Sequence, residues 1–282
     1  MFTEFAPAKI NLSLRVHNRR SDGFHDLTSL VAFADVGDRI SFAPSDRAGG
    51  SLTLAYTGDY GGDLQQALDG DDVVLSAARL FGAGIAGVLT LEKNLPVMAG
   101  MGGGSADAAA VLRLFQRLHG QSHHDRAVEL GSDVPVCLLS RAAWMRGRGE
   151  QVAALTAFPE CPAVLVNAGI AMPTGPVFHA LERDRPEAAD AMTTPGGFAD
   201  LDAVVAHLRA HGNDLLTPAL SLAPEIRQVL ENIDESGAVV SGMSGSGATC
   251  FGLYQSRHDA ELGAEALSNH YPEGFVRATV LN

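Results

Sequence analysis

Hydrophobic and polar residues alternate near the start of the chain, which predicts a strand over residues 8–16. One face of this strand carries Ala8, Ile10, Leu12, Leu14 and Val16. The other face carries Lys9, Asn11, Ser13 and Arg15. Lys9 and Asn11 therefore project side by side, roughly 7 Å apart along the strand. The pattern alone favours a half-buried strand whose polar face is exposed to solvent, although a polar face this rich in reactive groups also suits a binding site.

The first half of the chain predicts a mixture of strands and helices. Strands are expected at residues 38–42, 51–56 and 87–91. Helices are expected at 71–83, 106–119 and 125–130, with another that starts at 132–135. Residues 106–119 give the clearest helical pattern, because hydrophobic residues recur at helical spacing and Gly120 is a typical stop.

The second half predicts a strand at 163–167, helices at 174–181, 201–211 and 223–234, strands at 238–241 and 248–254, a helix at 258–268 and a strand at 274–281. This is the order of a split βαβ, or ferredoxin-like, unit. We therefore predict an α+β protein with an N-terminal α/β domain at residues 1–155 and a C-terminal domain at 156–282. Residues 183–200 look like a loop or an insertion, and their role is open.

Composition narrows the class of protein. The 282 residues are 46% hydrophobic and 19% charged, with a net charge of −13, which argues against a nucleic-acid binder. Cys137, Cys161 and Cys250 form no CxxC pair, so we expect buried thiols in a reducing compartment. We see no secretory signal and no apolar run that spans a bilayer, and we expect a cytoplasmic protein without membrane partners.

A glycine-rich segment at 96–105 opens the helix that follows it. Its candidate phosphate-binding residues are Pro96, Gly100, Gly102, Gly103, Gly104 and Ser105. Clustered glycines let backbone N–H groups converge on an anion, and a helix N-terminus adds unpaired amides. Ser105 is a good N-cap residue, so a flexible connector with an ordinary cap is the alternative. The segment lacks the Lys-Ser/Thr ending of a Walker A loop and is not a dinucleotide fingerprint.

Three further stretches carry candidate chemistry. A second glycine cluster at 241–247 could be a long hairpin loop or part of a shared nucleotide cleft. Asp133 could cap a helix, but Ser132 could cap equally well and leave Asp133 free to accept a hydroxyl proton. Lys9 could then stabilise phosphate charge. Asp22-Gly23 favours a hairpin turn, and a less favoured interpretation has Phe24 and His25 contact a base.

Taken together, these segments resemble the small-molecule kinase superfamily named GHMP after galactokinase, homoserine kinase, mevalonate kinase and phosphomevalonate kinase. Within it, the chain is similar to the kinases of 4-diphosphocytidyl-2-C-methyl-D-erythritol. The resemblance covers nearly the whole chain. It depends on the segments 7–12, 20–27, 96–109, 131–136 and 245–251. The glycine loop marks the superfamily, whereas Pro-Ala-Lys-Ile-Asn-Leu and Asp-Gly-Phe-His are specific to the one kinase.

The resemblance implies a two-domain GHMP-kinase-like fold that binds ATP with the glycine-rich segment. Lys9 and Asp133 match the catalytic pair, with Asp133 as the base toward the 2-hydroxyl of the acceptor. The residues that match the acceptor site are Asn11, Phe24, His25, Phe178 and Gly245. Cytosine would lie between two aromatic rings, with a His at its edge. The product would be the 2-phosphate, an intermediate of the non-mevalonate route to isoprenoid precursors.

The resemblance also implies Mg²⁺, held mainly by ATP phosphates and water, because no protein ligand can be assigned. We expect a monomer or weak homodimer. Asp72 stands where an Asn usually lies near adenine, and Phe24 stands where Tyr is also common. Another kinase of the superfamily, acting on homoserine or mevalonate, and a nucleotide-binding regulator without catalysis remain alternatives. A purely structural module would not need two glycine loops.

Overall fold

The computed structural model describes residues 1–45, 50–67, 72–82, 84–183, 192 and 194–282. The strands are β1 (Phe2–Arg19), β2 (His25–Pro44), β3 (Leu52–Thr57), β4 (Gly87–Glu92), β5 (Ala143–Gly147), β6 (Gln151–Ala154), β7 (Cys161–Asn167), β8 (Val240–Met243), β9 (Cys250–Leu253) and β10 (Phe275–Leu281). The helices are α1 (Gly61–Ala67), α2 (Val73–Arg79), α3 (Gly103–His119), the 3₁₀ turn η1 (His124–Arg126), α4 (Ala127–Leu130), α5 (Val134–Leu139), α6 (Thr174–Arg183), α7 (Leu201–His211), α8 (Leu216–Leu222), α9 (Glu225–Glu235) and α10 (Arg257–His270).

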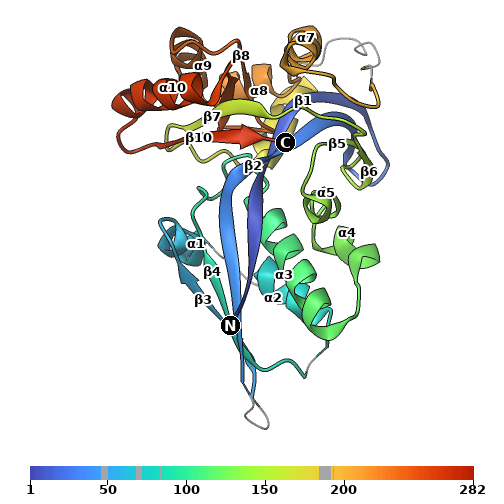
Figure 1. Ribbon diagram of the computed structural model, residues 1–282. Helices are drawn as coiled ribbons and strands as arrows, with labels where there is room; N and C mark the ends of the chain where they lie inside the picture. The colour runs from blue at the N-terminus through green and yellow to red at the C-terminus, as the bar shows by residue number, and fades with distance from the viewer. Residues whose placement is uncertain (46–49, 68–71, 83, 184–191, 193) are drawn as a thin grey trace.

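A long antiparallel hairpin of β1 and β2 organises the sheets. Near its end, β2 pairs with β4, which pairs in parallel with β3. Near its beginning, β2 pairs with β5, which pairs with β6. Figure 1 shows α2 and α3 beside this hairpin. One face of the N-terminal sheet is thereby covered by helices that bury a hydrophobic core.

The C-terminal strands form an antiparallel sheet in the order β10-β7-β9-β8. Relative to chain order, this is the fourth strand, then the first, third and second, which is the ferredoxin-like arrangement. Helices α9 and α10 lie over this sheet in Figure 1. The α+β fold class and the split βαβ order are therefore confirmed.

The two halves share strand β2 and a common core. β10 pairs with β2 at Leu281 and Ala34, so the sheets are continuous there. One hydrophobic cluster joins β1 and the segment before α3 to β7, β9 and β10. β6 ends at Ala154 and β7 begins at Cys161. The division of the chain at residues 155 and 156 stays a prediction, because β2 contributes to both sheets.

Several sequence expectations differ from the structure. The polar face of β1 is buried rather than exposed: Lys9 and Asn11 are each 4% exposed, and Ser13 is fully buried. The helix expected at 71–83 is shorter, because Asp72 caps α2 and α2 ends at Arg79. Strands β5 and β6 were not predicted, since the buried run from Ala143 to Met145 lacks alternation and β6 is short. Much of 183–200, namely residues 184–191 and 193, lies outside the described residues.

A buried ion cluster joins β2, the segment after β4 and α3. The Lys93 ammonium lies 2.5 Å from Asp38 Oδ2 and 2.8 Å from Asp107 Oδ2, and all three side chains are almost fully buried. Asp38 Oδ1 also accepts hydrogen bonds from the amides of Asn94 and Leu95. A side chain at Gly103 would lie 2.8 Å from the Lys93 ammonium. The cluster therefore fixes the start of α3 directly against Lys93.

Replacement of Lys93 by Met should strongly destabilise the protein, because the buried carboxyl groups of Asp38 and Asp107 would lose their counter-charge and a hydrogen-bond donor. We expect the free energy of unfolding to fall by about 3–5 kcal/mol, as measured by urea denaturation. Arg126→Met, which removes an exposed ion pair with Glu129, serves as a control and should have little effect. Equal losses in the two variants would contradict a stabilising role for the cluster.

The same cluster predicts a pH dependence of stability. Burial, reinforced by the charge of Asp38 and opposed by Lys93, raises the pKa of Asp107 to about 7. The folded protein then keeps a proton that the unfolded chain has lost, so this contribution to stability declines as the pH rises from about 4 through about 7. Over that range, urea denaturation should show the wild-type free energy of unfolding falling by about 2–4 kcal/mol relative to Asp107→Asn. A constant difference between the two proteins would contradict it.

Candidate active site

A cavity of about 1030 Å³ lies between the two halves of the molecule. Its wall is built from β1, the glycine-rich segment, the start of α3, the turn before α5, the start of α6 and the loop between β8 and β9. The cavity brings together every residue singled out from the sequence. They are Lys9, Asn11, Phe24, His25, Pro96, Gly100, Gly102, Gly103, Gly104, Ser105, Asp133, Phe178 and Gly245.

The glycine-rich segment bends sharply before α3. Gly100 and Gly102 have φ of 76° and 61°, a left-handed conformation that favours glycine. Gly102 is the N-cap of α3, so the expectation that Ser105 caps this helix is wrong. The left-handed turn at Gly102 starts the helix at Gly103 and places Ser105 in its first turn. The amides of this first turn have no partner inside the helix and are suited to an anion.

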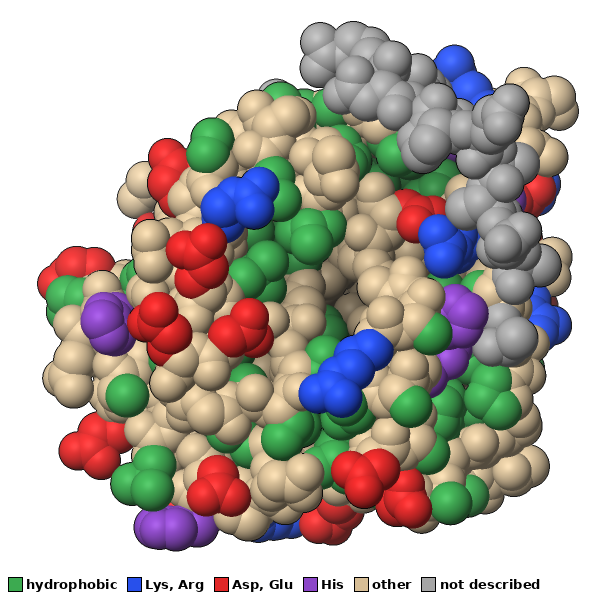
Figure 2. Space-filling model, turned by 90° about the horizontal axis from the view of Figure 1, so that it is seen from above, with side chains coloured by type: hydrophobic (Ala, Val, Ile, Leu, Met, Phe, Trp, Pro, Cys, Tyr) green, Lys and Arg blue, Asp and Glu red, His purple; other side chains and the backbone are tan. Residues whose placement is uncertain are grey.

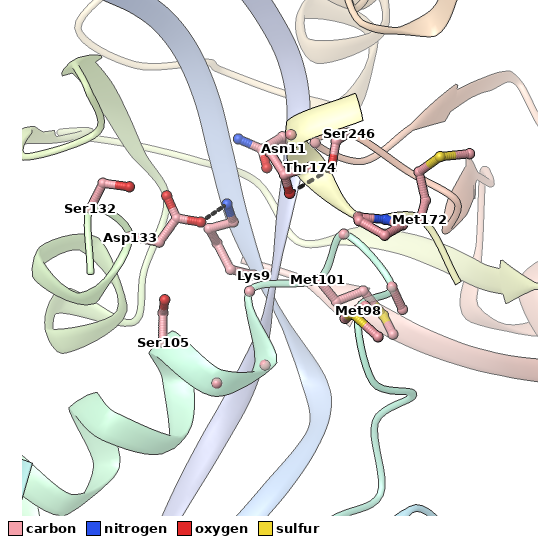
Figure 3. A pocket seen from close by; sticks show the side chains of 18 of the residues that line it. Lys9, Asn11, Met98, Met101, Ser105, Ser132, Asp133, Met172, Thr174 and Ser246 are labelled. Atoms are coloured by element: carbon pink, nitrogen blue, oxygen red, sulfur yellow. Dashed lines mark hydrogen bonds and ion pairs between the residues drawn. The ribbon is translucent and has the colours of Figure 1, made fainter. Parts of the chain in front are cut away.

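Groups from other parts of the fold donate hydrogen bonds to the backbone carbonyls of the glycine-rich segment. Each of the four carbonyls from Met98 to Met101 accepts one hydrogen bond. The donors, in order of acceptor, are the Met172 amide at 3.2 Å, the Thr249 amide at 3.2 Å, the Ser244 hydroxyl at 2.8 Å and the Lys9 amide at 2.9 Å. Figure 3 shows Met98 and Met172 on the same side of the cavity. The carbonyls are thus satisfied within the protein, which leaves the amide groups of the loop and of α3 for a ligand.

Lys9 and Asp133 form an ion pair inside the cavity, with Lys9 Nζ 2.7 Å from Asp133 Oδ2. The Lys9 side chain is 5% exposed, whereas that of Asp133 is 30% exposed. Asp133 occupies the N-cap position of α5 but makes no capping hydrogen bond with its side chain. Its carboxylate therefore points toward Lys9, above Ser105 at the start of α3 (Figure 3). The pair places a cation and a partly accessible base beside the glycine loop.

Asn11 connects this pair to the second glycine cluster. Its side-chain amide donates to the Ser29 hydroxyl at 2.8 Å, and its backbone amide donates to the Ser244 hydroxyl at 3.0 Å. A side chain at Gly245 would lie 3.2 Å from Asn11 Oδ1, so the loop between β8 and β9 approaches β1 closely. This loop packs on Gly100 as well, because a side chain there would meet the Gly247 carbonyl at 2.6 Å.

Aromatic side chains line the end of the cavity near the β1–β2 turn. The hairpin turn expected at Asp22-Gly23 is present, and Phe24 at its end is 52% exposed. His25 stacks on Phe178, with ring centroids 5.3 Å apart. The guanidinium of Arg148 lies over the Phe24 ring at 5.0 Å. The hairpin and the ligand-facing interpretation of Phe24 and His25 are therefore compatible, since both residues line the cavity.

Other cavity residues either departed from the family pattern, as Asp72 does, or were not singled out from the sequence. Asp72 lines the cavity, but its carboxylate accepts from the Val74 amide at 2.6 Å and from the Tyr56 hydroxyl at 2.7 Å. Lys93 and Arg148 also line the cavity and were not singled out. One signal for Lys93 was available: the chain contains two lysines, Lys9 and Lys93, and both line the cavity.

The surface seen from above has hydrophobic side chains around a central hollow, with acidic and basic side chains interspersed (Figure 2). Among the described residues, no helix is long and apolar enough to cross a membrane. The described part of the chain likewise contains no group of three or more His, Cys, Asp or Glu side chains that could hold a metal ion. The three cysteines are unpaired and buried, as expected.

Two family models match the chain. Residues 72–141 match "GHMP kinases N terminal domain" and residues 198–273 match "GHMP kinases C terminal". These ranges include α3 with the whole glycine-rich segment before it, α5 with Asp133, and the second glycine cluster. Part of the cavity wall therefore lies in the matched ranges, whereas β1, the β1–β2 turn and α6 lie outside them.

Close relatives match over nearly their full length. The 4-diphosphocytidyl-2-C-methyl-D-erythritol kinase of Cereibacter sphaeroides is 46% identical, with 98% of each chain covered. The kinase of the same name from Paracoccus denitrificans is 45% identical, covering 99% of this chain and 96% of that one.

Solved structures of related kinases also match the chain. A crystal structure of 4-(cytidine 5'-diphospho)-2C-methyl-D-erythritol kinase matches with a TM-score of 0.78 and 35% identity, covering 99% of both chains. A homoserine kinase from Cytophaga hutchinsonii matches with a TM-score of 0.61 at 17% identity and supports the fold alone. The chain belongs to the GHMP kinase family and, within it, to the group of its 4-diphosphocytidyl-2-C-methyl-D-erythritol kinase relatives.

Proposed function

We propose that the protein transfers the γ-phosphoryl group of ATP to the 2-hydroxyl of 4-diphosphocytidyl-2-C-methyl-D-erythritol. The products are ADP and the 2-phosphate, an intermediate of the non-mevalonate route to isoprenoid precursors. The observation that carries this proposal is the Lys9–Asp133 pair, which lies beside the glycine loop in one cavity with Phe24 and His25. The named relatives supply the identity of the acceptor.

ATP binds with its phosphates against the amides of the glycine loop and the first turn of α3. The helix dipole and the unpaired amides favour the negative charge there. The fixed carbonyls from Met98 to Met101 support this role, because a preorganised loop does not need to rearrange when charge develops. Lys9 is the nearby cation that offsets charge on the transferring phosphoryl group.

Asp133 acts as the base toward the acceptor hydroxyl. As the hydroxyl oxygen bonds to the γ-phosphorus and the bond to ADP breaks, Asp133 accepts the hydroxyl proton. Its carboxylate is 30% exposed, so one side can reach the hydroxyl while Oδ2 stays on Lys9. The transfer is direct, without a covalent enzyme intermediate, and most of the catalysis comes from positioning and electrostatics.

Mg²⁺ fits this cavity as an ion carried by ATP. Oxygen donors suit Mg²⁺, which commonly keeps several waters and binds one or two protein groups. Ser105 and Asp133 are the oxygen donors beside the loop that could contact it. When bound, the ion neutralises phosphate charge and orients the β- and γ-phosphates. No dedicated cage of protein ligands is required.

The aromatic end of the cavity holds the cytosine. Phe24 supplies an exposed ring, and Phe178 supplies a second ring on α6. His25 offers ring nitrogens that can hydrogen bond to the edge of a base. Its ring covers one face of Phe178, so cytosine stacks on the other face or displaces His25. Asn11 holds the part of the acceptor between the base and the reacting hydroxyl.

Asp133→Asn should remove the base while keeping the shape of the cavity. We expect kcat to fall by about 10²–10⁴ in an ADP-release assay, since this is the usual contribution of general base catalysis. The affinity for ATP, measured by isothermal titration, should change little because the loop amides remain. Asp125→Asn, at an exposed residue in η1, is the control and should behave as wild type. Normal turnover in Asp133→Asn would remove this residue from the mechanism.

A panel of acceptors tests the identity of the substrate. With ATP and Mg²⁺, purified protein should release ADP with 4-diphosphocytidyl-2-C-methyl-D-erythritol and should be nearly inactive with homoserine or mevalonate. Those two alcohols carry no base for Phe24 and Phe178. Turnover of either in preference to the cytidine compound would overturn the assigned acceptor. Binding of ATP without turnover of any acceptor would instead favour a regulatory protein.

A further inference from the structure

The turn between β5 and β6 forms part of the cavity wall. Gly147 and Gly149 have φ of 70° and 124°, so both need the freedom of glycine. The Arg148 amide donates to the Glu150 carboxylate at 2.6 Å, and the Gly149 amide donates to the Arg146 carbonyl at 3.1 Å. These contacts fix the backbone on both sides of Arg148, whose side chain lines the cavity.

Arg148 is a cation without a bound carboxylate in the described part of the chain. Its guanidinium lies over the Phe24 ring, 5.0 Å from the ring centre, and the residue is half-buried. The two lysines of the cavity differ from Arg148 in this respect. Lys9 is paired with Asp133, and Lys93 is enclosed by two carboxylates. Stacking on an aromatic ring leaves the N–H groups at the edge of a guanidinium available to an anion.

The turn lies between the two ends of the proposed acceptor site. Arg148 contacts Phe24, at the end that would hold the base. A side chain at the next residue, Gly149, would lie 3.4 Å from Asp133 Oδ1, at the end that would hold the reacting hydroxyl. An acceptor that reaches from Phe24 to Asp133 therefore has both of its ends beside this turn.

We propose that Arg148 binds the diphosphate of the nucleoside-diphosphate acceptor and so helps to select it. This inference rests on the proposed function, because it takes the base to lie at Phe24. A planar guanidinium can donate two parallel hydrogen bonds to phosphate oxygens, which an ammonium cannot match. Arg148 thereby favours an acceptor with a charged linker over an uncharged nucleoside or a simple alcohol.

The carboxylate of Asp22 is close enough to Arg148 for this cation to affect the pKa of Asp22. Asp22 is exposed, and its slight desolvation favours a higher pKa, but hydrogen bonds from the Phe24 amide and Arg20 and the charges of Arg20 and Arg148 outweigh this effect and lower the pKa. Asp22 already binds Arg20 at 3.2 Å and accepts from the Phe24 amide at 3.2 Å. The Asp22 carboxylate therefore interacts mainly with groups of its own turn, and the Arg148 guanidinium can still donate hydrogen bonds to a phosphate.

CDP carries a diphosphate and cytidine does not, so their binding distinguishes a contact between Arg148 and phosphate from an effect of Arg148 on the Phe24 ring. Isothermal titration of CDP and cytidine should be compared for wild type, Arg148→Gln and Arg146→Gln. In Arg148→Gln, the Kd for CDP should rise by about ten- to a hundredfold, the usual loss for a hydrogen bond to a charged group, and the Kd for cytidine should change by less than about threefold. Arg146 is exposed and donates to Thr194, so its variant controls for loss of a nearby positive charge.

Steady-state kinetics should show an effect of Arg148 on binding of the acceptor but not on the chemical step. Arg148→Gln should raise KM for the cytidine acceptor, with KM for ATP and kcat close to wild type, because the residue touches neither ATP nor the reacting hydroxyl.

Three outcomes of the titration would overturn the proposal, and they are distinguishable. Equal losses for CDP and cytidine would show that Arg148 acts only by orienting Phe24. An unchanged Kd for CDP in Arg148→Gln would show that it does not contact the diphosphate. Failure of the wild-type protein to bind CDP at all would refute the base site itself, and with it the proposed function.

Discussion

The hydrogen bonds that hold the carbonyls from Met98 to Met101 are the constraint on which the site depends. A glycine-rich segment is conformationally permissive, so its sequence alone does not fix the direction of its amides. Here its acceptors are satisfied by β1, by the segment before α6 and by the loop between β8 and β9. The glycine-rich segment of one half is therefore shaped partly by the other half, so the two halves must assemble before it takes this conformation.

The cavity contains buried cations although the protein as a whole is negatively charged. The protein carries a net charge of −13, yet its two lysines both line the cavity, each held by carboxylates. Buried charges are costly unless they are paired, so the carboxylates keep both cations in place beside the glycine-rich segment. Lys9 remains next to a partly exposed base, whereas Lys93 is fully enclosed and supports the start of α3.

Much of the regular secondary structure could be predicted from periodicity, and motifs together with a family resemblance named candidate residues that the fold brings into one cavity. Alternation identified β1, and helical spacing identified α3. Burial of the polar face of β1 could not be predicted, because alternation does not reveal what covers each face. The cap of α3 was misplaced at Ser105, since the left-handed turn at Gly102 depends on its close approach to Lys9. Lys93 and Arg148 were missed because their roles depend on contacts with residues far away in the chain.

The most direct test is a crystal structure of the protein with a non-hydrolysable ATP analogue and 4-diphosphocytidyl-2-C-methyl-D-erythritol. The γ-phosphate should lie against the amides of Gly102 to Ser105, and the 2-hydroxyl should lie within hydrogen-bond reach of Asp133, about 2.6–3.2 Å. The cytosine should stack on Phe24 or Phe178. A nucleotide bound away from the glycine loop, or an acceptor whose 2-hydroxyl faces away from Asp133, would contradict the proposed function.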